Sequence, residues 1–374
     1  MRLPLLSCPS VFLSILLAGV AYAEDDAQRA KDAVIVRTLQ RLPGVDLSTK
    51  PEAKAALLRH LATINGTDSY FDLIEKFNLR DMSPELLRLA TEPAESALGV
   101  KAARLLVKFN EQELLGQAIA DPDPTKAAKI VAVLGLLADS KTNDLLAPLV
   151  TNGDLSLAVR SAAVTGMGRN APGQKLLLDL VQQGKLPPDT QFAAANSLLS
   201  SADESIRTAA GKHLALPAGA GGEPLPPVSH LVSQSGDAAR GKTLFAGVGT
   251  CAKCHKVLGE GKDVGPDLSE IGSKLSKEAM YVSILDPNAG VSFNYETYVA
   301  RTLDGTTLSG ILVSQTDDAV ELKTAESIVH KLKRDDIEAS KKLPTSLMPA
   351  DLQKQLKADD LIDIVEYLTT LKKK

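Results

Sequence analysis

The sequence lacks a long apolar run, an excess of basic residues and a second group of cysteines. Each absence argues against one class of protein or site. Its leading apolar stretch, residues 11–20, is far shorter than the roughly 20 residues that span a bilayer, which argues against a membrane anchor. The 42 lysines and arginines are outnumbered by 46 acidic residues, and this mildly acidic balance argues against nucleic-acid binding. Three cysteines are too few for the two ligand pairs of a typical zinc site.

The first residues have the layout of a cleavable secretory signal. Arg2 precedes the apolar stretch, and Ala21, Tyr22 and Ala23 precede an acidic segment that begins at Glu24. The sequence therefore predicts a signal peptide over residues 1–23, a periplasmic or secreted location, and a mature chain without a transmembrane span. Loss of Arg2 changes the formal net charge from -4 to about -5. Cys8 leaves with the signal, so the mature chain keeps only Cys251 and Cys254.

Residues 24–215 are expected to be entirely helical. Apolar residues recur at helical spacing, as at Leu57, Leu58 and Leu61, and proline interrupts the later segments. The segment VRSAA at 159–163 resembles IRTAA at 206–210, which indicates degenerate repeats. Short paired helices of this kind resemble HEAT repeats, which stack into an α-solenoid because no pair buries its apolar face alone. An irregular helical bundle is the alternative.

Glycine and proline then mark a domain boundary. Residues 216–227 read LPAGAGGEPLPP, a composition that cannot hold a helix, so residues 216–235 are predicted to be a linker. The length of the chain favours at least two domains, and residues 236–374 are assigned to the second. The expected fold is mainly α, with an N-terminal solenoid and a C-terminal domain of different composition.

The segment CAKCH, residues 251–255, carries the chemistry of the second domain. Two thiols three positions apart can attach to both vinyl groups of one porphyrin, and the adjacent imidazole of His255 can bind its iron. A thioredoxin-like dithiol needs a βαβ setting, and a zinc site needs further ligands; neither is present in the sequence. Cys251 and Cys254 are therefore predicted to hold one covalent haem c, with His255 as an iron ligand.

Five ordered segments extend this motif into a family resemblance. They are GKTLF at 241–245, CAKCH at 251–255, GPDL at 265–268, ILDP at 284–287 and SLMP at 346–349. Together they resemble the class I cytochrome c fold, in the variant described as the Pirellula/Verrucomicrobium-type haem-binding domain. The resemblance runs from about Gly236 to Leu371.

The resemblance implies roles for particular residues. His255 is expected to donate a hydrogen bond from its other ring nitrogen to the carbonyl of Pro266, which fixes the ring. Gly241 and Phe245 are expected to cross the last helix near Tyr367.

The sixth iron ligand is expected to be Met348, because it lies just before the terminal helix, where the class I fold presents its methionine. Met280 lies in an expected helix and His330 in an expected strand, so both are interpreted as non-ligands. An open or histidine-bound iron remains the alternative.

Between residues 294 and 333 the pattern becomes strand-like. Asp304 and Gly305 separate two apolar runs, which is a hairpin signal. The family variant likewise carries a small β insertion, which is therefore predicted at about 294–333.

These features predict a periplasmic or secreted monohaem cytochrome that transfers single electrons and is not an enzyme. The helical repeats would act as a docking module for a redox partner protein, either a periplasmic dehydrogenase or an electron acceptor. Two alternatives stay open: a peroxidase-like haem enzyme, and a haem-bearing scaffold for protein interactions.

Overall fold

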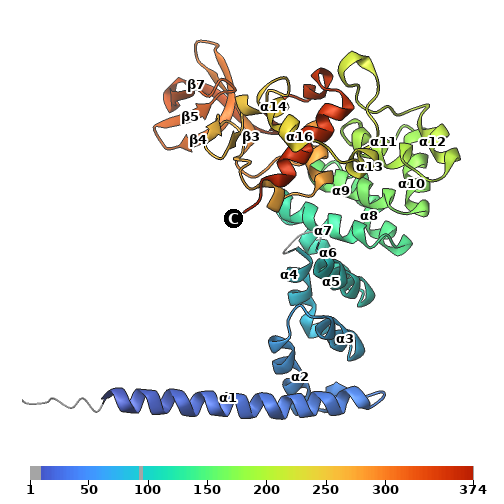
Figure 1. The fold of residues 1–374 in the computed structure, drawn as a ribbon, viewed down its shortest axis with the longest axis vertical. Coiled ribbons are helices and arrows are strands. Elements are labelled where there is room, and N and C mark those ends of the chain that lie inside the picture. The colour runs from blue at the N-terminus through green and yellow to red at the C-terminus, as the bar shows by residue number, and fades with distance from the viewer. Residues whose placement is uncertain (1–9, 92–95, 374) are drawn as a thin grey trace, which may run out of the picture. The chain divides into compact units, whose positions relative to one another are not determined.

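The computed structural model describes residues 10–91 and 96–373, which form two compact units divided between Glu111 and Gln112. The described residues are mainly helical, and the strands lie in the C-terminal part of the chain (Figure 1). No helix in these described ranges is long and apolar enough to cross a membrane.

The described residues of the first unit form five α-helices. Buried leucines at Leu57, Leu61, Leu86 and Leu106 form its apolar interior. Arg2 and Cys8 of the predicted signal lie outside the described residues, and the predicted cleavage point after Ala23 falls within the first helix. The helices are α1 (Ser10–Arg41), α2 (Pro51–Thr63), α3 (Asp68–Lys76), α4 (Ser83–Thr91) and α5 (Ala97–Lys108).

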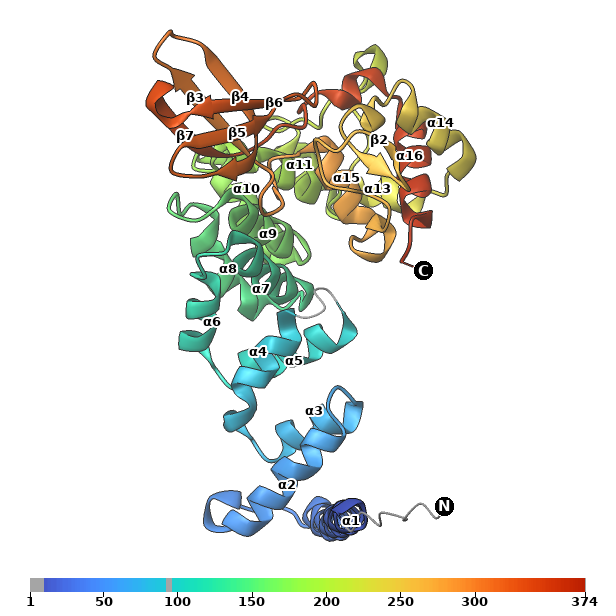
Figure 2. The same ribbon diagram turned by 90° about the vertical axis from the view of Figure 1, so that its left-hand side faces the viewer.

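The second unit begins with seven short helices, in which α9 packs against α7, α8, α10 and α11 (Figure 2). Close approach of α7 and α9 depends on glycine: a Cβ atom on Gly135 would lie 2.5 Å from the Cα atom of Gly166. The prediction that this region is entirely helical is confirmed for these seven helices, while the HEAT-like character of the helices stays a prediction. The helices are α6 (Gln112–Ile119), α7 (Pro124–Leu136), α8 (Asn143–Val150), α9 (Leu157–Gly168), α10 (Ala171–Gln182), α11 (Gln191–Leu199) and α12 (Glu204–Ala210).

The segment predicted as a linker, residues 216–235, contains the short helix α13 (Val228–Ser233). Val228 and Leu231 are buried in the same apolar cluster as the C-terminal helices. The backbone N–H of Val228 also donates to Oδ1 of Asn196 on α11, at 2.8 Å. This part of the segment is therefore packed against its neighbours on both sides.

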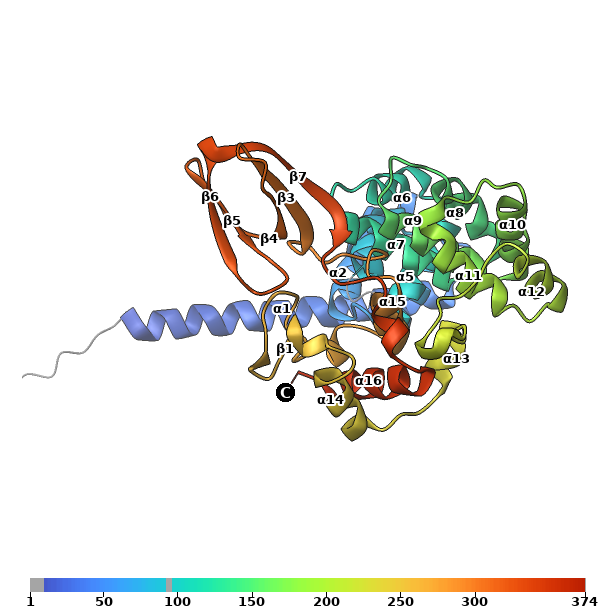
Figure 3. The same cartoon turned by 90° about the horizontal axis from the view of Figure 1, so that it is seen from above.

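The C-terminal helices pack around one apolar core. A Cβ atom on Gly241 would lie 1.9 Å from the carbonyl oxygen of Asp363, so α14 and α16 meet backbone to backbone, side by side in Figure 3. The rings of Phe245 and Tyr367 meet edge to face at 5.7 Å, so the predicted crossing near Tyr367 is confirmed. The helices are α14 (Ala238–Ala246), α15 (Lys277–Leu285) and α16 (Ala358–Thr370).

A five-stranded antiparallel sheet with strand order β6-β5-β4-β3-β7 lies between α15 and α16 in the chain. Its small core contains Tyr298, Ala300, Val320 and Leu322. Gly305, with φ of +87°, makes the turn between β3 and β4, which confirms the predicted hairpin. The strands are β3 (Glu296–Thr302), β4 (Thr307–Gln315), β5 (Ala319–Lys323), β6 (Val329–Lys333) and β7 (Ile337–Ser346).

The sheet extends beyond the predicted insertion of residues 294–333, because β7 continues it to Ser346. This strand is mostly exposed and has no apolar-polar alternation, so it gives no strand signal in the sequence. It lies at the edge of the sheet beside β3, where Pro344 is tolerated. Strand β7 therefore ends two residues before Met348.

Candidate haem-binding site

Cys251, Cys254 and His255 lie on one tight turn directly after α14. Thr250 adopts a left-handed conformation, with φ of +54°, and starts the 3₁₀ helix η6 (Cys251–Lys253). The backbone N–H of His255 donates to the carbonyl oxygen of Cys251 at 2.9 Å, and that of Cys254 donates to the same oxygen at 3.1 Å. Both cysteines are half-buried and free. Hydrogen bonds within the motif therefore place both cysteines and His255 on the same turn.

The segment after the motif folds back and pairs with it. The N–H groups of Val264 and Gly265 both donate to the carbonyl oxygen of Cys254, at 3.0 and 2.8 Å. The N–H of Lys262 donates to the carbonyl oxygen of Ala252 at 3.1 Å. These bonds bring Pro266 next to His255, although eleven positions separate them in the chain.

The imidazole of His255 is held in one tautomer. Its Nδ1 lies 2.8 Å from the carbonyl oxygen of Pro266. A carbonyl oxygen only accepts hydrogen bonds, so Nδ1 must carry the proton and donate it. Nε2 is then the unprotonated nitrogen, which is the form that binds a metal. Burial also lowers the pKa of His255, which favours the neutral ring at pH 7.

Gly265 provides the space that the ring occupies. A Cβ atom at this position would lie 2.6 Å from Cε1 and 2.9 Å from Nδ1 of His255. Any side chain would therefore push the ring away from the Pro266 carbonyl. Local sequence indicates only a turn at Gly265 and Pro266; the close contact with the imidazole becomes visible only in the structure.

Burial disfavours the ionised form of both thiols. Burial raises the pKa of Cys251 to about 11 and also raises the pKa of Cys254. Reactive dithiols have lowered pKa values, because the thiolate is the reacting species. The raised pKa values are therefore unlike those of a reactive dithiol. Within the residues that the structure describes, no group of three or more His, Cys, Asp or Glu side chains is arranged to hold a metal ion.

Met348 follows the end of β7. Its backbone N–H donates to Oγ of Ser346 at 3.1 Å, and the N–H of Ser346 donates to Oδ1 of Asn288 at 2.9 Å. The half-buried side chain packs against the C-terminal apolar core, as does Cys251. Met280 belongs to the interior of that core with 2% of its surface exposed, and His330 lies on β6.

The β insertion contacts the loop that follows the CAKCH motif, which the sequence does not reveal. Nζ of Lys262 donates to the carbonyl oxygen of Glu326, at the tip of the β5–β6 hairpin, at 3.3 Å. Nζ of Lys323 donates to the carbonyl oxygen of Asp263 at 3.1 Å and lies 3.1 Å from its carboxylate. Lys323 lowers the pKa of Asp263, as expected for such a pair. Such contacts join residues 60 or more positions apart, so no local pattern predicts them.

These residues fit a covalently bound haem. One turn presents two free thiols, the tautomer of His255 leaves Nε2 available, and Gly265 leaves room for the ring. Met348 packs on the same apolar core, so its thioether is a candidate for the second axial position.

Comparison with known proteins agrees with this geometry. A family model described as Cytochrome c matches residues 238–321, from the start of α14 into β5. No curated protein matches the chain. The matched range contains Cys251, Cys254, His255 and Pro266, whereas Met348 and α16 lie beyond it. The C-terminal part of this chain thus contains a c-type cytochrome domain, which implies a haem c cofactor.

Proposed function

We propose that this protein is an extracytoplasmic monohaem cytochrome that transfers single electrons and is not an enzyme. The observation that supports it most directly is the hydrogen bond from Nδ1 of His255 to Pro266, which leaves Nε2 free on the turn that carries both thiols. A bound haem supplies a one-electron couple between ferric and ferrous iron.

The residues of the chain have distinct tasks in this proposal. Cys251 and Cys254 attach the porphyrin, so the cofactor stays in place through repeated oxidation and reduction. His255 binds the iron through Nε2, and the Pro266 carbonyl keeps the ring from rotating. Met348 would hold the iron through its thioether, and a soft sulfur ligand would favour the ferrous state and raise the potential. An iron held on both sides favours electron transfer over the binding of an external substrate.

The N-terminal helices serve as a docking module in the same proposal. Their pattern resembles HEAT repeats, whose stacked helices present extended binding surfaces. The signal-like residues 1–23 would direct the protein to the periplasm or outside the cell. The partner would be a redox protein there, either a periplasmic dehydrogenase or an electron acceptor.

Haem retention tests the proposal. The protein, produced in a host that attaches haem to exported cytochromes, is expected to keep its haem during denaturing electrophoresis and acid-acetone extraction. Replacement of both Cys251 and Cys254 by Ser should abolish this retention, because no thioether can form. A wild-type protein that releases its haem under either treatment would contradict the covalent assignment.

A further inference from the structure

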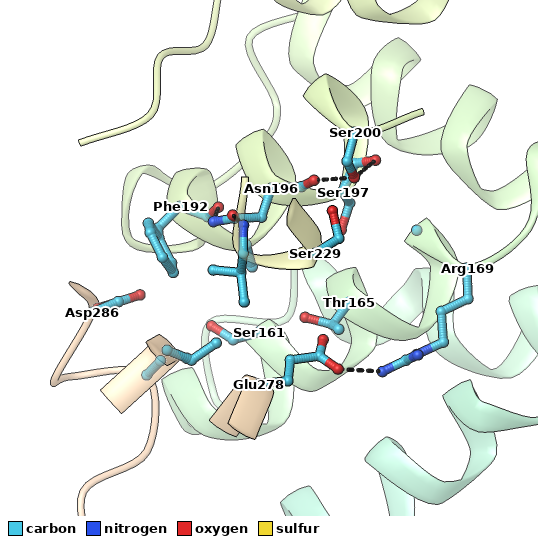
Figure 4. Close-up of a pocket in the computed structure, with 15 residues that line it drawn as sticks. Ser161, Thr165, Arg169, Phe192, Asn196, Ser197, Ser200, Ser229, Glu278 and Asp286 are labelled. Carbon is cyan, nitrogen blue, oxygen red and sulfur yellow. Dashed lines mark hydrogen bonds and ion pairs between the residues drawn. The ribbon is translucent and has the colours of Figure 1, made fainter. Parts of the chain in front are cut away.

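A small cavity with both hydroxyl groups and apolar groups in its walls contains none of the haem-site residues in its lining. Its volume is about 190 Å³, and its walls come from α9 and α11 on one side and from α13, α15 and the residues after α15 on the other (Figure 4). Five hydroxyl side chains line it: Ser161, Thr165, Ser197, Ser200 and Ser229. This density of hydroxyl groups distinguishes the cavity from the leucine- and alanine-rich contacts between neighbouring helices.

Ser161 is the unusual member of this group. Its side chain is only 7% exposed, and its Oγ is buried without a hydrogen-bond partner. Burying an unpaired hydroxyl destabilises a fold, so such a group calls for an explanation. In the related segment 206–210 the corresponding residue is Thr208, which is exposed. Figure 4 shows the hydroxyl of Ser161 directed toward the side of the cavity where Asp286 lies.

Asp286 adds a carboxylate to the cavity wall. It follows α15 directly and is half-buried, and burial raises its pKa although the backbone N–H groups of Asn288 and Ala289 bond to it. A carboxylate in this setting gains from further hydrogen-bond donors. The unpaired hydroxyl of Ser161 and the half-buried carboxylate of Asp286 are thus the two groups that a polar ligand would complement.

The remaining walls limit what that partner can be. Arg169 and Glu278 form an ion pair across the cavity at 3.5 Å, so their charges offset each other. Among the charged side chains that line the cavity, Asp286 is the one outside this ion pair, and its negative charge disfavours phosphates and carboxylates. Phe192 and Val282 supply an apolar wall.

Asn196 has a structural task in the same wall. Its amide group donates to the carbonyl oxygen of Phe192 at 2.9 Å and accepts from the N–H of Val228 at 2.8 Å. Asn196 therefore links α11 to α13, and this link maintains the shape of the cavity wall.

We propose that this cavity binds a small neutral polyol of about the size of a monosaccharide. Hydroxyl groups both donate and accept, as do the serine and threonine side chains that would meet them. Two ligand hydroxyls would donate to Asp286, another would pair with Ser161, and the carbon skeleton would lie against Phe192. The inference does not depend on the haem.

The test uses the full chain and named probes: glucose, galactose, mannitol and myo-inositol, followed by saturation-transfer NMR and calorimetry. At least one of these polyols is expected to bind. The variants Ser161→Ala and Asp286→Asn should each weaken its binding by about tenfold or more, because each removes a polar partner of the ligand. Ser161→Ala should also raise the melting temperature of the free protein, since an unpaired buried hydroxyl is lost.

Ser233→Ala is the matched control. Ser233 lies on α13 like Ser229, but its hydroxyl donates to the carbonyl oxygen of His230 and does not line the cavity. Binding should be unchanged in this variant. The proposal is overturned if none of the four polyols binds, which would leave a cavity filled by water only. It is equally overturned if Ser161→Ala and Asp286→Asn bind as the wild type does, or if a diamine such as putrescine binds and the polyols do not.

Discussion

The haem-binding segment and the helices α6–α12 reach their structures by different physical means. Around the CAKCH motif, a few close contacts determine the geometry. Nδ1 of His255 meets the carbonyl oxygen of Pro266, and neither Gly241 nor Gly265 has room for a methyl group. Helices α6–α12 are held mainly by many buried aliphatic contacts and capped helix ends, with a close glycine contact between Gly135 of α7 and Gly166 of α9. We infer that the first segment tolerates few substitutions, whereas the second, outside its close glycine contacts, distributes its stability over many residues.

The largest expected effect comes from Gly241→Ala. The new methyl group would lie 1.9 Å from the Asp363 carbonyl oxygen, so α14 and α16 must separate. We expect a loss of about 3 kcal/mol in the free energy of unfolding of the C-terminal part. Denaturant titration followed by circular dichroism measures it.

The matched control lies in the other region. Gly116 is inside α6, and a Cβ atom there would meet nothing within 4 Å. Gly116→Ala should therefore stabilise the protein by about 0.5 to 1 kcal/mol, because alanine is the better helix former. Equal destabilisation by the two substitutions would remove the contrast between the regions.

The next effect concerns Gly265→Ala. A methyl group 2.6 Å from Cε1 of His255 displaces the ring, so Nδ1 loses the Pro266 carbonyl and Nε2 loses its fixed direction. We expect the yield of haem-loaded protein to fall severalfold, and the remaining haem to show a changed visible spectrum. Gly290→Ala, where nothing lies within 4 Å, serves as the control and should load haem normally.

A smaller effect is expected for an ion pair in the helical region. Arg160, with 9% of its surface exposed, donates from both terminal nitrogens to Asp189, at 2.7 and 2.5 Å. Asp189→Asn should destabilise the protein by about 1 kcal/mol at pH 7, a modest value because Asp189 is itself half exposed.

The same pair predicts a pH dependence. Hydrogen bonds from Arg160 lower the pKa of Asp189, so the stabilisation is complete above the ordinary aspartate pKa of 3.8. It is lost as the pH falls through the lowered value. Thermal melts from pH 7 to pH 2 should therefore show the difference between wild type and Asp189→Asn shrinking in acid; a constant difference would contradict the role of this pair.

The two regions also differ in what their sequences reveal. A motif with fixed spacing identifies individual residues, so the sequence predicts Cys251, Cys254 and His255 as the haem-binding residues. The family resemblance adds Pro266, whose carbonyl oxygen lies 2.8 Å from Nδ1 of His255. Helical periodicity identifies only the type of element, so the partners of α9 and the cavity beside Ser161 could not be predicted.

The missed elements have physical reasons. Strand β7 lacks alternating apolar residues because it is an exposed edge strand, and α13 is a helix of six residues that follows Pro227. The contact between Lys323 and Asp263 joins segments that no local pattern connects. Long-range contacts of this kind depend on the complete fold.

The central claim is that the iron is held by His255 and Met348, so that the protein carries electrons. The most direct measurement is the near-infrared absorption of the ferric protein, where a sulfur-to-iron charge-transfer band is expected, together with resistance of the ferrous protein to carbon monoxide. Met348→Ala should remove the band, open the iron to carbon monoxide and lower the reduction potential, whereas Met280→Leu, in the apolar core, should change none of these. A wild-type protein without the band that binds carbon monoxide rapidly would contradict the claim.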